Sequence, residues 1–227
     1  MERHIIMDIA LVFLMTCLLV EVGLNIQLRV KLCKWYALKI FVIKKAWARP
    51  CLPLSVFLLV SYHMGMRIRK AVETDFPVIL ALYDEARTFM HSHGNPRQWN
   101  GGYPSESLLR DDLAGGRLYV VTDDESILGV FVFFVGMEPT YARIVAGAWP
   151  DDKPYGVVHR IASRQGSHGV GTFALEWAWR ESGRHLRIDT HKDNLPMRRL
   201  VAKQGFRYCG IVFMEDGTER MAFQKNG

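Results

Sequence analysis

The sequence predicts an α/β domain with a mixed sheet over residues 66–227, preceded by a hydrophobic and basic extension over residues 1–65. Three observations predict this. Apolar, β-branched runs recur between segments of helical periodicity. Capping residues and glycines mark the ends of the helical segments. The expected order is strand, two helices, three strands, helix, strand, helix and two strands, which is typical of a domain with helices packed on a mixed sheet.

The domain is expected to open with a strand and a helix. Residues 66–71 alternate between apolar and charged side chains, as a short strand does. Thr74 or Asp75 can cap the helix that follows, and Pro77 falls in its first turn. The helical periodicity continues to about Met90.

A second helix and a hairpin come next. A polar, turn-rich segment occupies residues 91–104, and Ser105 is a favourable cap for a helix that ends at Gly115. Residues 118–122 and 127–135 are strand-like and are separated by a short acidic turn. Gly129 lies inside the second strand, which indicates a bulge.

The last part of the domain alternates strands and helices before a closing hairpin. Strands are expected over 157–162 and 186–190, helices over 171–181 and 194–203, and the hairpin strands over 208–214 and 220–223. Asn194 is placed to cap the last helix and Gly205 to end it.

A glycine-rich loop connects the 157–162 strand to the helix that follows it. The loop reads Gly-Ser-His-Gly-Val-Gly over residues 166–171. Glycines let the backbone approach a ligand closely, and the N-terminus of a helix favours negative charge. The loop therefore indicates a phosphate site, although glycines also serve as tight connections in this position.

The positive charge of the chain belongs to the extension. Residues 1–65 carry a net charge of +5 and residues 66–227 a net charge of +1. A near-neutral domain gives no support to nucleic-acid binding. Three of the four cysteines lie in the extension and only Cys209 lies in the domain. A single thiol forms no internal disulfide, so we expect a cytoplasmic domain.

The extension has two uncharged apolar runs, over residues 9–20 and 50–66, on either side of a basic segment. Neither run is clean enough over about 20 residues to predict a spanning helix. Two interpretations stay open. In one, the chain starts at Met66 or Met64 and the preceding residues are upstream sequence translated by error. In the other, residues 1–65 are a membrane-associated segment with Lys and Arg on a polar face, and membrane contact would be confined to them.

Two motifs together resemble the GNAT superfamily of N-acetyltransferases. The first is the glycine loop, and the second is the run from Asn194 through Met197 and Lys203 to Gly205 and Phe206. The resemblance covers residues 66–227 and none of the extension. It implies a mixed, mostly antiparallel sheet of six to seven strands flanked by about four helices. It also implies that acetyl-CoA is the co-substrate and that no metal takes part.

The sequence departs from the pattern of that superfamily at two positions. The Gln or Arg that usually stands three residues before the middle glycine is Gly166, whereas Arg164 and Gln165 are displaced along the chain. A Tyr that often follows the Asn by seven residues, and protonates the leaving thiolate, is Val201. Another group or solvent must then supply that proton.

The resemblance also implies which residues contact the cofactor. Backbone groups of the strand before the loop would pair with the pantetheine chain, the loop would hold the pyrophosphate, and the second motif would contact the pantetheine and a phosphate. These residues are Ile161, Ala162, Gly166, Ser167, His168, Gly169, Val170, Gly171, Asn194, Met197 and Lys203. From the residues alone, Asn194 is expected to be an N-cap, and it could cap the helix and contact the cofactor at once. Lys203 could either contact a phosphate or be only a cationic residue at the end of the helix.

The candidate bases are His159, Asp189 and His191. The unperturbed pKa of histidine, about 6.5, suits a proton acceptor at neutral pH. Side chains repeat every second residue along a strand, so Asp189 and His191 are expected to share a face. The structural alternatives are a His159 bonded to a carbonyl and an Asp189 paired with a neighbouring arginine. A metal site built on Asp189 and His191 would need a third ligand, and the sequence suggests none.

The acceptor is expected to lie against the turn-rich segment and the loop after residue 135. Gln98, Trp99, Tyr103 and Tyr141 are the candidates, with the aromatic rings forming a wall that could face a cation. Trp99 could equally fix the loop to the core.

The favoured function is acetyl transfer from acetyl-CoA to a primary amine of a small or amino-acid-like molecule. The alternatives are a protein or peptide N-acetyltransferase and an inactive acyl-CoA-binding sensor. A dinucleotide-dependent oxidoreductase is disfavoured, because its glycine loop belongs early in the fold. The sequence leaves a homodimer open.

Overall fold

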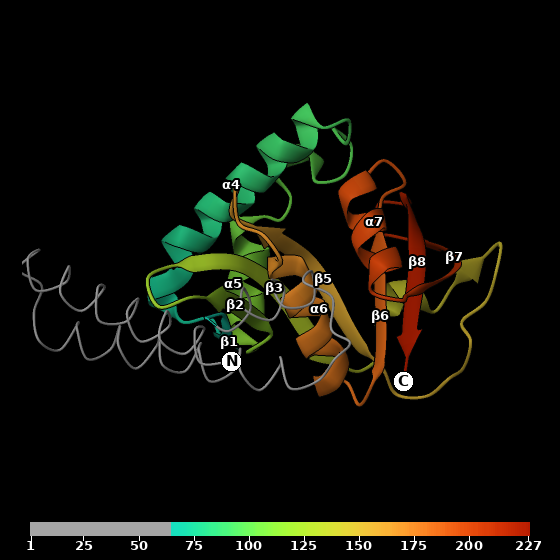
Figure 1. The fold of residues 1–227 in the computed structure, drawn as a ribbon. Helices are drawn as coiled ribbons and strands as arrows, with labels where there is room; N and C mark the ends of the chain where they lie inside the picture. The colour runs from blue at the N-terminus through green and yellow to red at the C-terminus, as the bar shows by residue number, and fades with distance from the viewer. Residues whose placement is uncertain (1–64) are drawn as a thin grey trace, which may run out of the picture. The chain divides into compact units, whose positions relative to one another are not determined.

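The computed structural model describes residues 65–227, so the expectations for the extension fall almost wholly outside the described residues. Eight strands form one sheet in the order β1-β2-β3-β5-β6-β8-β7-β4 (Figure 1). The strands are β1 Arg67–Lys70, β2 Leu118–Thr122, β3 Ile127–Val135, β4 Ile144–Val145, β5 Gly156–Ser163, β6 His185–Thr190, β7 Arg207–Phe213 and β8 Glu219–Asn226.

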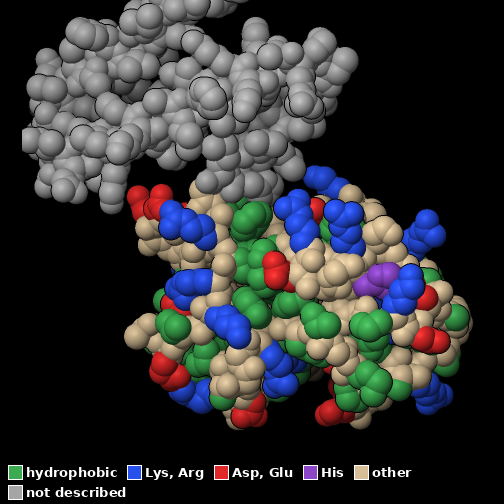
Figure 2. All heavy atoms as spheres, turned by 90° about the horizontal axis from the view of Figure 1, so that it is seen from below, with side chains coloured by type: hydrophobic (Ala, Val, Ile, Leu, Met, Phe, Trp, Pro, Cys, Tyr) green, Lys and Arg blue, Asp and Glu red, His purple; other side chains and the backbone are tan. Residues whose placement is uncertain are grey.

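Four α-helices accompany the sheet within the described residues: α4 Phe76–Ser92, α5 Glu106–Ala114, α6 Val170–Glu181 and α7 Leu195–Lys203. Short 3₁₀ turns occupy Glu73–Asp75, Asn100–Gly102 and Pro139–Tyr141. None of the helices over 65–227 is long and apolar enough to cross a membrane. On the face shown in Figure 2, acidic and basic side chains are interspersed, as the near-neutral charge of this part predicts.

The mixed, mostly antiparallel α/β architecture is confirmed. The sheet has one strand more than expected, because β4 has only two residues and gives no periodicity in the sequence. Two apolar clusters cover the two faces of the sheet. One contains Ala174 and Leu175 of α6, and the other contains Ile79 and Leu82 of α4. The sheet is therefore covered by helices on both sides.

Helix caps follow the sequence with one exception. Ser105 accepts a hydrogen bond from the Leu108 N–H, and Asn194 accepts one from the Met197 N–H. Asp75 stands directly before α4 but makes no capping hydrogen bond. Its carboxylate instead receives bonds of 2.6 and 2.9 Å from Arg69. The local pattern predicts that the Asp75 side chain caps α4, but in the structure this side chain forms an ion pair with Arg69 instead.

The parallel pair β5 and β6 parts halfway along its length. Pairing runs from Gly156 with Leu186 to Val158 with Ile188, and β5 and β6 continue beyond it. The outer edges of the two strands stay paired, β5 with β3 and β6 with β8. The facing edges beyond Val158 therefore carry backbone groups that this sheet does not pair.

A bulge in β5 lies just past that point. His159 pairs with Val132 and Ala162 with Val130, so Arg160 and Ile161 together oppose Phe131. Arg160 has a φ of +52°, a conformation that costs a non-glycine residue energy. The Tyr83 hydroxyl of α4 donates a 2.8 Å hydrogen bond to the Arg160 carbonyl. Helix α4 therefore holds the bulge in place.

Candidate active site

A cleft of about 1030 Å³ opens where β5 and β6 part. Figure 1 shows α4 and α7 on opposite sides of this opening. The cleft is lined by parts of α4, the 97–103 segment, the 137–140 loop, β5, the 164–167 loop, β6, the start of α7 and the turn between β7 and β8.

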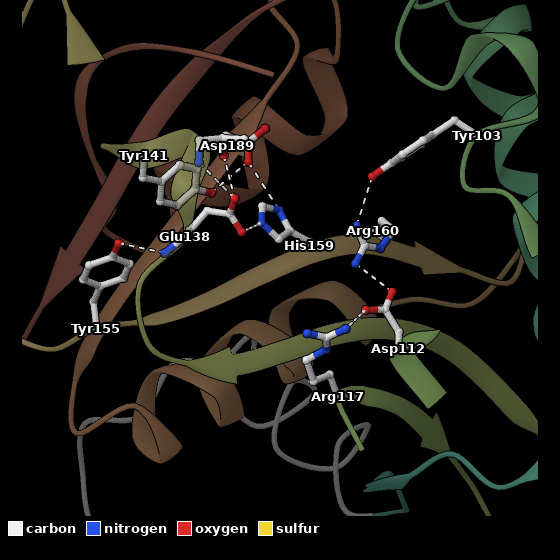
Figure 3. A network of polar contacts seen from close by, with 10 residues as sticks. Tyr103, Asp112, Arg117, Glu138, Tyr141, Tyr155, His159, Arg160 and Asp189 are labelled. Atoms are coloured by element: carbon white, nitrogen blue, oxygen red, sulfur yellow. Dashed lines mark hydrogen bonds and ion pairs between the residues drawn. The ribbon is translucent and has the colours of Figure 1, made fainter. Parts of the chain in front are cut away.

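His159 stands between two carboxylates on one wall of the cleft (Figure 3). Its Nε2 lies 2.9 Å from Glu138 Oε2, and its Nδ1 lies 3.4 Å from Asp189 Oδ1. The Tyr141 hydroxyl donates to Asp189 Oδ1 at 2.8 Å. His159 therefore meets a carboxylate and not a carbonyl, and within residues 65–227 no arginine pairs with Asp189.

The Glu138 carboxylate is ionised at neutral pH. Burial alone would raise its pKa, but hydrogen bonds from His159 and Thr140 and the charge of His159 lower it to about 2. An ionised carboxylate only accepts hydrogen bonds, so Nε2 of His159 must carry the hydrogen. Burial and the Asp189 charge raise the pKa of Tyr141 well above its ordinary value, so Tyr141 stays protonated.

A second polar cluster surrounds the bulge residue Arg160. Its guanidinium donates to Asp112 Oδ2 at 2.7 Å and to the Tyr103 hydroxyl at 3.0 Å (Figure 3). Arg117 lies 3.4 Å from the other oxygen of Asp112. The Asp112 side chain is 2% exposed, so one buried carboxylate holds two guanidinium groups. Helix α5 is fixed to β5 by this contact.

Of the expected acceptor residues, Gln98, Trp99 and Tyr103 line the cleft. Trp99 also packs edge-on against Tyr83 of α4, with ring centroids 5.6 Å apart, so it fixes the segment to the core as well. Tyr141 is buried at 2% exposure and is absent from the cleft lining, but it contacts the site through its hydrogen bond to Asp189 and through its ring, which packs edge-on against His159.

Gln98 connects the two sides of the cleft. Its Oε1 accepts hydrogen bonds of 2.8 Å from both Asn95 and Asn194. Asn194 belongs to the start of α7, 96 residues away in sequence. Asn194 is thus an N-cap and at the same time part of a bridge between the 97–103 segment and α7.

The expected cofactor residues divide into two groups. Those that line the cleft are Ile161, Ala162, Gly166, Ser167, Gly171, Asn194 and Met197. Those that do not are His168, Gly169, Val170 and Lys203. The Val170 side chain is in the core at 2% exposure, so that residue offers only backbone groups. Lys203 ends α7, as a cationic helix end does.

His191 lies apart from the carboxylate network. Strand β6 ends at Thr190, so the alternation of side chains stops before His191. Its Nδ1 accepts from the Asp193 N–H and lies 3.4 Å from the Asp193 carboxylate. Burial and the charge of Arg220 lower its pKa. The structure therefore joins Asp189 to His159 by a contact and places His191 in the turn before α7.

Three polar residues that shape the site could not be recognised from the sequence. Glu138 and Asp112 lie outside the two motifs and meet their partners only through tertiary contacts. Thr190 lines the cleft, is 1% exposed, and has an Oγ1 without a hydrogen-bond partner. Leaving a buried polar group unsatisfied typically costs about 1–3 kcal/mol. A ligand that supplies the missing partner would recover that energy.

The glycine loop has the geometry of an anion site. Gly166 and Gly169 have φ values of +80° and +73°, and a side chain at Gly166 would meet open space. Arg164, one residue past β5, lines the cleft with its Nε buried and unpartnered. Gly166 stands where the superfamily usually has Gln or Arg. The Arg164 guanidinium nevertheless lies beside the loop and can serve as a cation there.

No family model matches the chain. A search of curated proteins likewise finds no match.

Solved structures do match. An acetyltransferase of the GNAT family from Streptococcus agalactiae 2603 is 30% identical, with a TM-score of 0.61, over 72% of this chain and 96% of that one. A protein from Staphylococcus aureus Mu50, described as an acetyltransferase, is 25% identical, with a TM-score of 0.53, over 70% and 97%. The NatC complex bound to Gag peptide and CoA shares the fold at 15% identity, with a TM-score of 0.50, over 72% and 99%.

Proposed function

The chain belongs to the GNAT family of acetyltransferases, and we propose that it transfers the acetyl group of acetyl-CoA to a primary amine of a small, amino-acid-like molecule. One observation carries the proposal: the Glu138–His159–Asp189 network faces the cleft where β5 and β6 part. We assign the reaction to the domain over 66–227, which contains all the lining residues that the described part of the chain contributes to this cleft.

The residues around the parted strands offer the kinds of groups that acetyl-CoA would need for binding. The unpaired edge of β5 at Ile161 and Ala162 offers backbone groups to the pantetheine amides. The glycine loop and the first N–H groups of α6 offer donors to the pyrophosphate, and Arg164 adds a cation. When bound, acetyl-CoA supplies an activated thioester, so the protein needs only to orient the reactants and manage protons.

The carboxylate network attracts the acceptor and takes its proton. The carboxylates of Glu138 and Asp189 place negative charge on this wall, which favours a cationic amine. Glu138 fixes the hydrogen on Nε2 of a neutral His159, so the lone pair is on Nδ1. A proton that reaches Nδ1, directly or through one water, makes an imidazolium that Asp189 stabilises at 3.4 Å.

The bridge through Gln98 supports a small acceptor over a peptide. The bond from Asn194 to Gln98 connects α7 to the 97–103 segment. The turn between β7 and β8 also lines the cleft, through Met214 and Asp216. An extended peptide would have to pass these two walls, whereas a small amine needs to reach only the network between them.

An acetyl-CoA turnover assay on the full chain tests the proposal. Purified protein is incubated with acetyl-CoA and a panel of amines, amino acids and N-terminal peptides, and thiol release is measured alongside product mass. We expect thiol release with at least one small amine, and an acetylated product of matching mass. His159→Ala is the matched variant. If His159 is the base, thiol release should fall to background in this variant.

The alternatives give different outcomes in the same assay. Turnover with peptides only would move the assignment to a peptide acetyltransferase. CoA binding without turnover of any acceptor would favour an acyl-CoA sensor. Turnover that His159→Ala leaves intact would overturn the role of the network.

A further inference from the structure

Thr190 is the last residue of β6; it lines the cleft and carries a buried hydroxyl group that has no partner. The side chain is 1% exposed, and Oγ1 has no hydrogen-bond partner in the structure. Strand pairing to β8 uses only its backbone, opposite Met221. Buried hydroxyl groups are normally satisfied, so an orphan on the wall of a cleft indicates a ligand atom that completes it.

The register of the sheet places Thr190 level with the bulge in β5. Val158 pairs with Ile188 at the last step before the strands part. Two residues further along each strand are Arg160 and Thr190. The bulge and the Thr190 hydroxyl therefore belong to opposite edges of the same opening, at the same depth. A group held by the bulge backbone would therefore lie at the level of Thr190 along the sheet.

Two side chains of α7 offer no proton. Val201 of α7 is fully buried in the apolar cluster beside α6 and carries no donor. Met197, which also lines the cleft from α7, has only a weakly accepting sulfur. From the α7 side of the sheet, Thr190 is the hydroxyl nearest in register to the bulge.

Resting on the proposed function, we infer that Thr190 is a catalytic residue whose hydroxyl donates a hydrogen bond to the sulfur of the departing coenzyme A. The ammonium first gives one proton to His159. The free amine nitrogen then bonds to the carbonyl carbon, and the C–S bond breaks with its electron pair left on sulfur. The nitrogen loses its second proton to solvent as the amide forms, and the thiolate finally gains one proton from solvent. Thr190 keeps its own proton and stabilises the negative sulfur meanwhile.

Spectroscopic titration of bound CoA tests this without any acceptor. The thiolate absorbs in the ultraviolet, so the pKa of the CoA thiol can be measured on wild type and on Thr190→Val, Thr190→Ser and Thr122→Val. Thr122 ends β2 outside the cleft and is the matched control. We expect Thr190→Val to raise the thiol pKa by about one unit, equivalent to a tenfold loss of thiolate stabilisation. Thr190→Ser and Thr122→Val should stay near wild type.

Thermal unfolding of the ligand-free protein separates a chemical role from a structural one. Val keeps the shape of Thr and removes an unsatisfied hydroxyl, so Thr190→Val should unfold at an equal or higher temperature. A lower temperature, with an unchanged thiol pKa, would show that Thr190 is structural. An unchanged thiol pKa in any folded Thr190→Val protein overturns the inference while leaving CoA binding, and so the proposed function, intact. If wild type binds no CoA, the proposed function fails first.

Discussion

His159 Nε2 lies 2.9 Å from Glu138 Oε2, and this contact joins the middle of β5 to the loop that follows β3. The two residues are 21 positions apart in the chain. The contact fixes which ring nitrogen carries hydrogen, and it directs the other nitrogen toward Asp189. The tautomer that the proposed proton transfer requires is therefore set by a single carboxylate.

The Glu138–His159 pair should make the free energy of unfolding depend on pH. The pKa of Glu138 is about 2 in the folded protein, below its ordinary 4.5. Its stabilising contribution is then complete above about pH 4.5 and is lost as the pH falls through 2. We expect this contribution to be roughly 3 kcal/mol at neutral pH. Urea unfolding of wild type and Glu138→Gln at several pH values measures it, and curves that stay parallel down to pH 2 would contradict it.

Loss of the His159 imidazole should reduce the chemical step. His159→Ala is expected to lower kcat by about 10²–10⁴, the usual contribution of a general base. CoA affinity should not change, because the glycine loop and Arg164 stay in place. His191→Ala separates the two histidines, since His191 lies outside the residues that line the cleft. A larger loss in His191→Ala than in His159→Ala would reverse the assignment.

Removal of the Asp112 carboxylate should destabilise the domain. Asp112→Ala leaves the 87% buried Arg160 side chain without its counter-ion, which typically costs about 3–5 kcal/mol. Arg117→Ala removes the half-exposed partner of the same carboxylate, and it should cost less than about 1 kcal/mol. Chemical denaturation of the two variants gives the comparison. Equal losses would mean that Arg160 finds another partner.

The glycine loop can be tested with two glycines of like conformation. Gly166 and Gly183 both have positive φ, +80° and +66°, and at both a side chain would meet open space. Gly166→Val and Gly183→Val should therefore lose similar stability, on the order of 1–2 kcal/mol. Only Gly166→Val should weaken CoA binding, measured by calorimetry, since only Gly166 lines the cleft. Equal CoA affinities would remove the loop from the site.

Local sequence patterns predicted most of the fold because strands, helices and helix caps depend on residues that are close together in the chain. Seven of the strands, the four helices and the caps at Ser105 and Asn194 follow from periodicity and from capping residues close to the helices they start. The pattern failed for β4, which is too short to show a period. It also failed for the side chain of Asp75, which bonds to Arg69 instead of capping α4.

The sequence by itself determined the family, the glycine loop and the candidate histidine His159, because each of these is written in residues near one another in the chain. Only the tertiary structure decided that Glu138 and Asp189 hold that histidine, that Asp112 holds the bulge residue Arg160, and that Thr190 faces the parted strands. These contacts join residues tens of positions apart, and no periodicity specifies which distant carboxylate a buried cation will meet. Burial makes that choice, because a charged or polar group taken out of water must find a partner inside the fold.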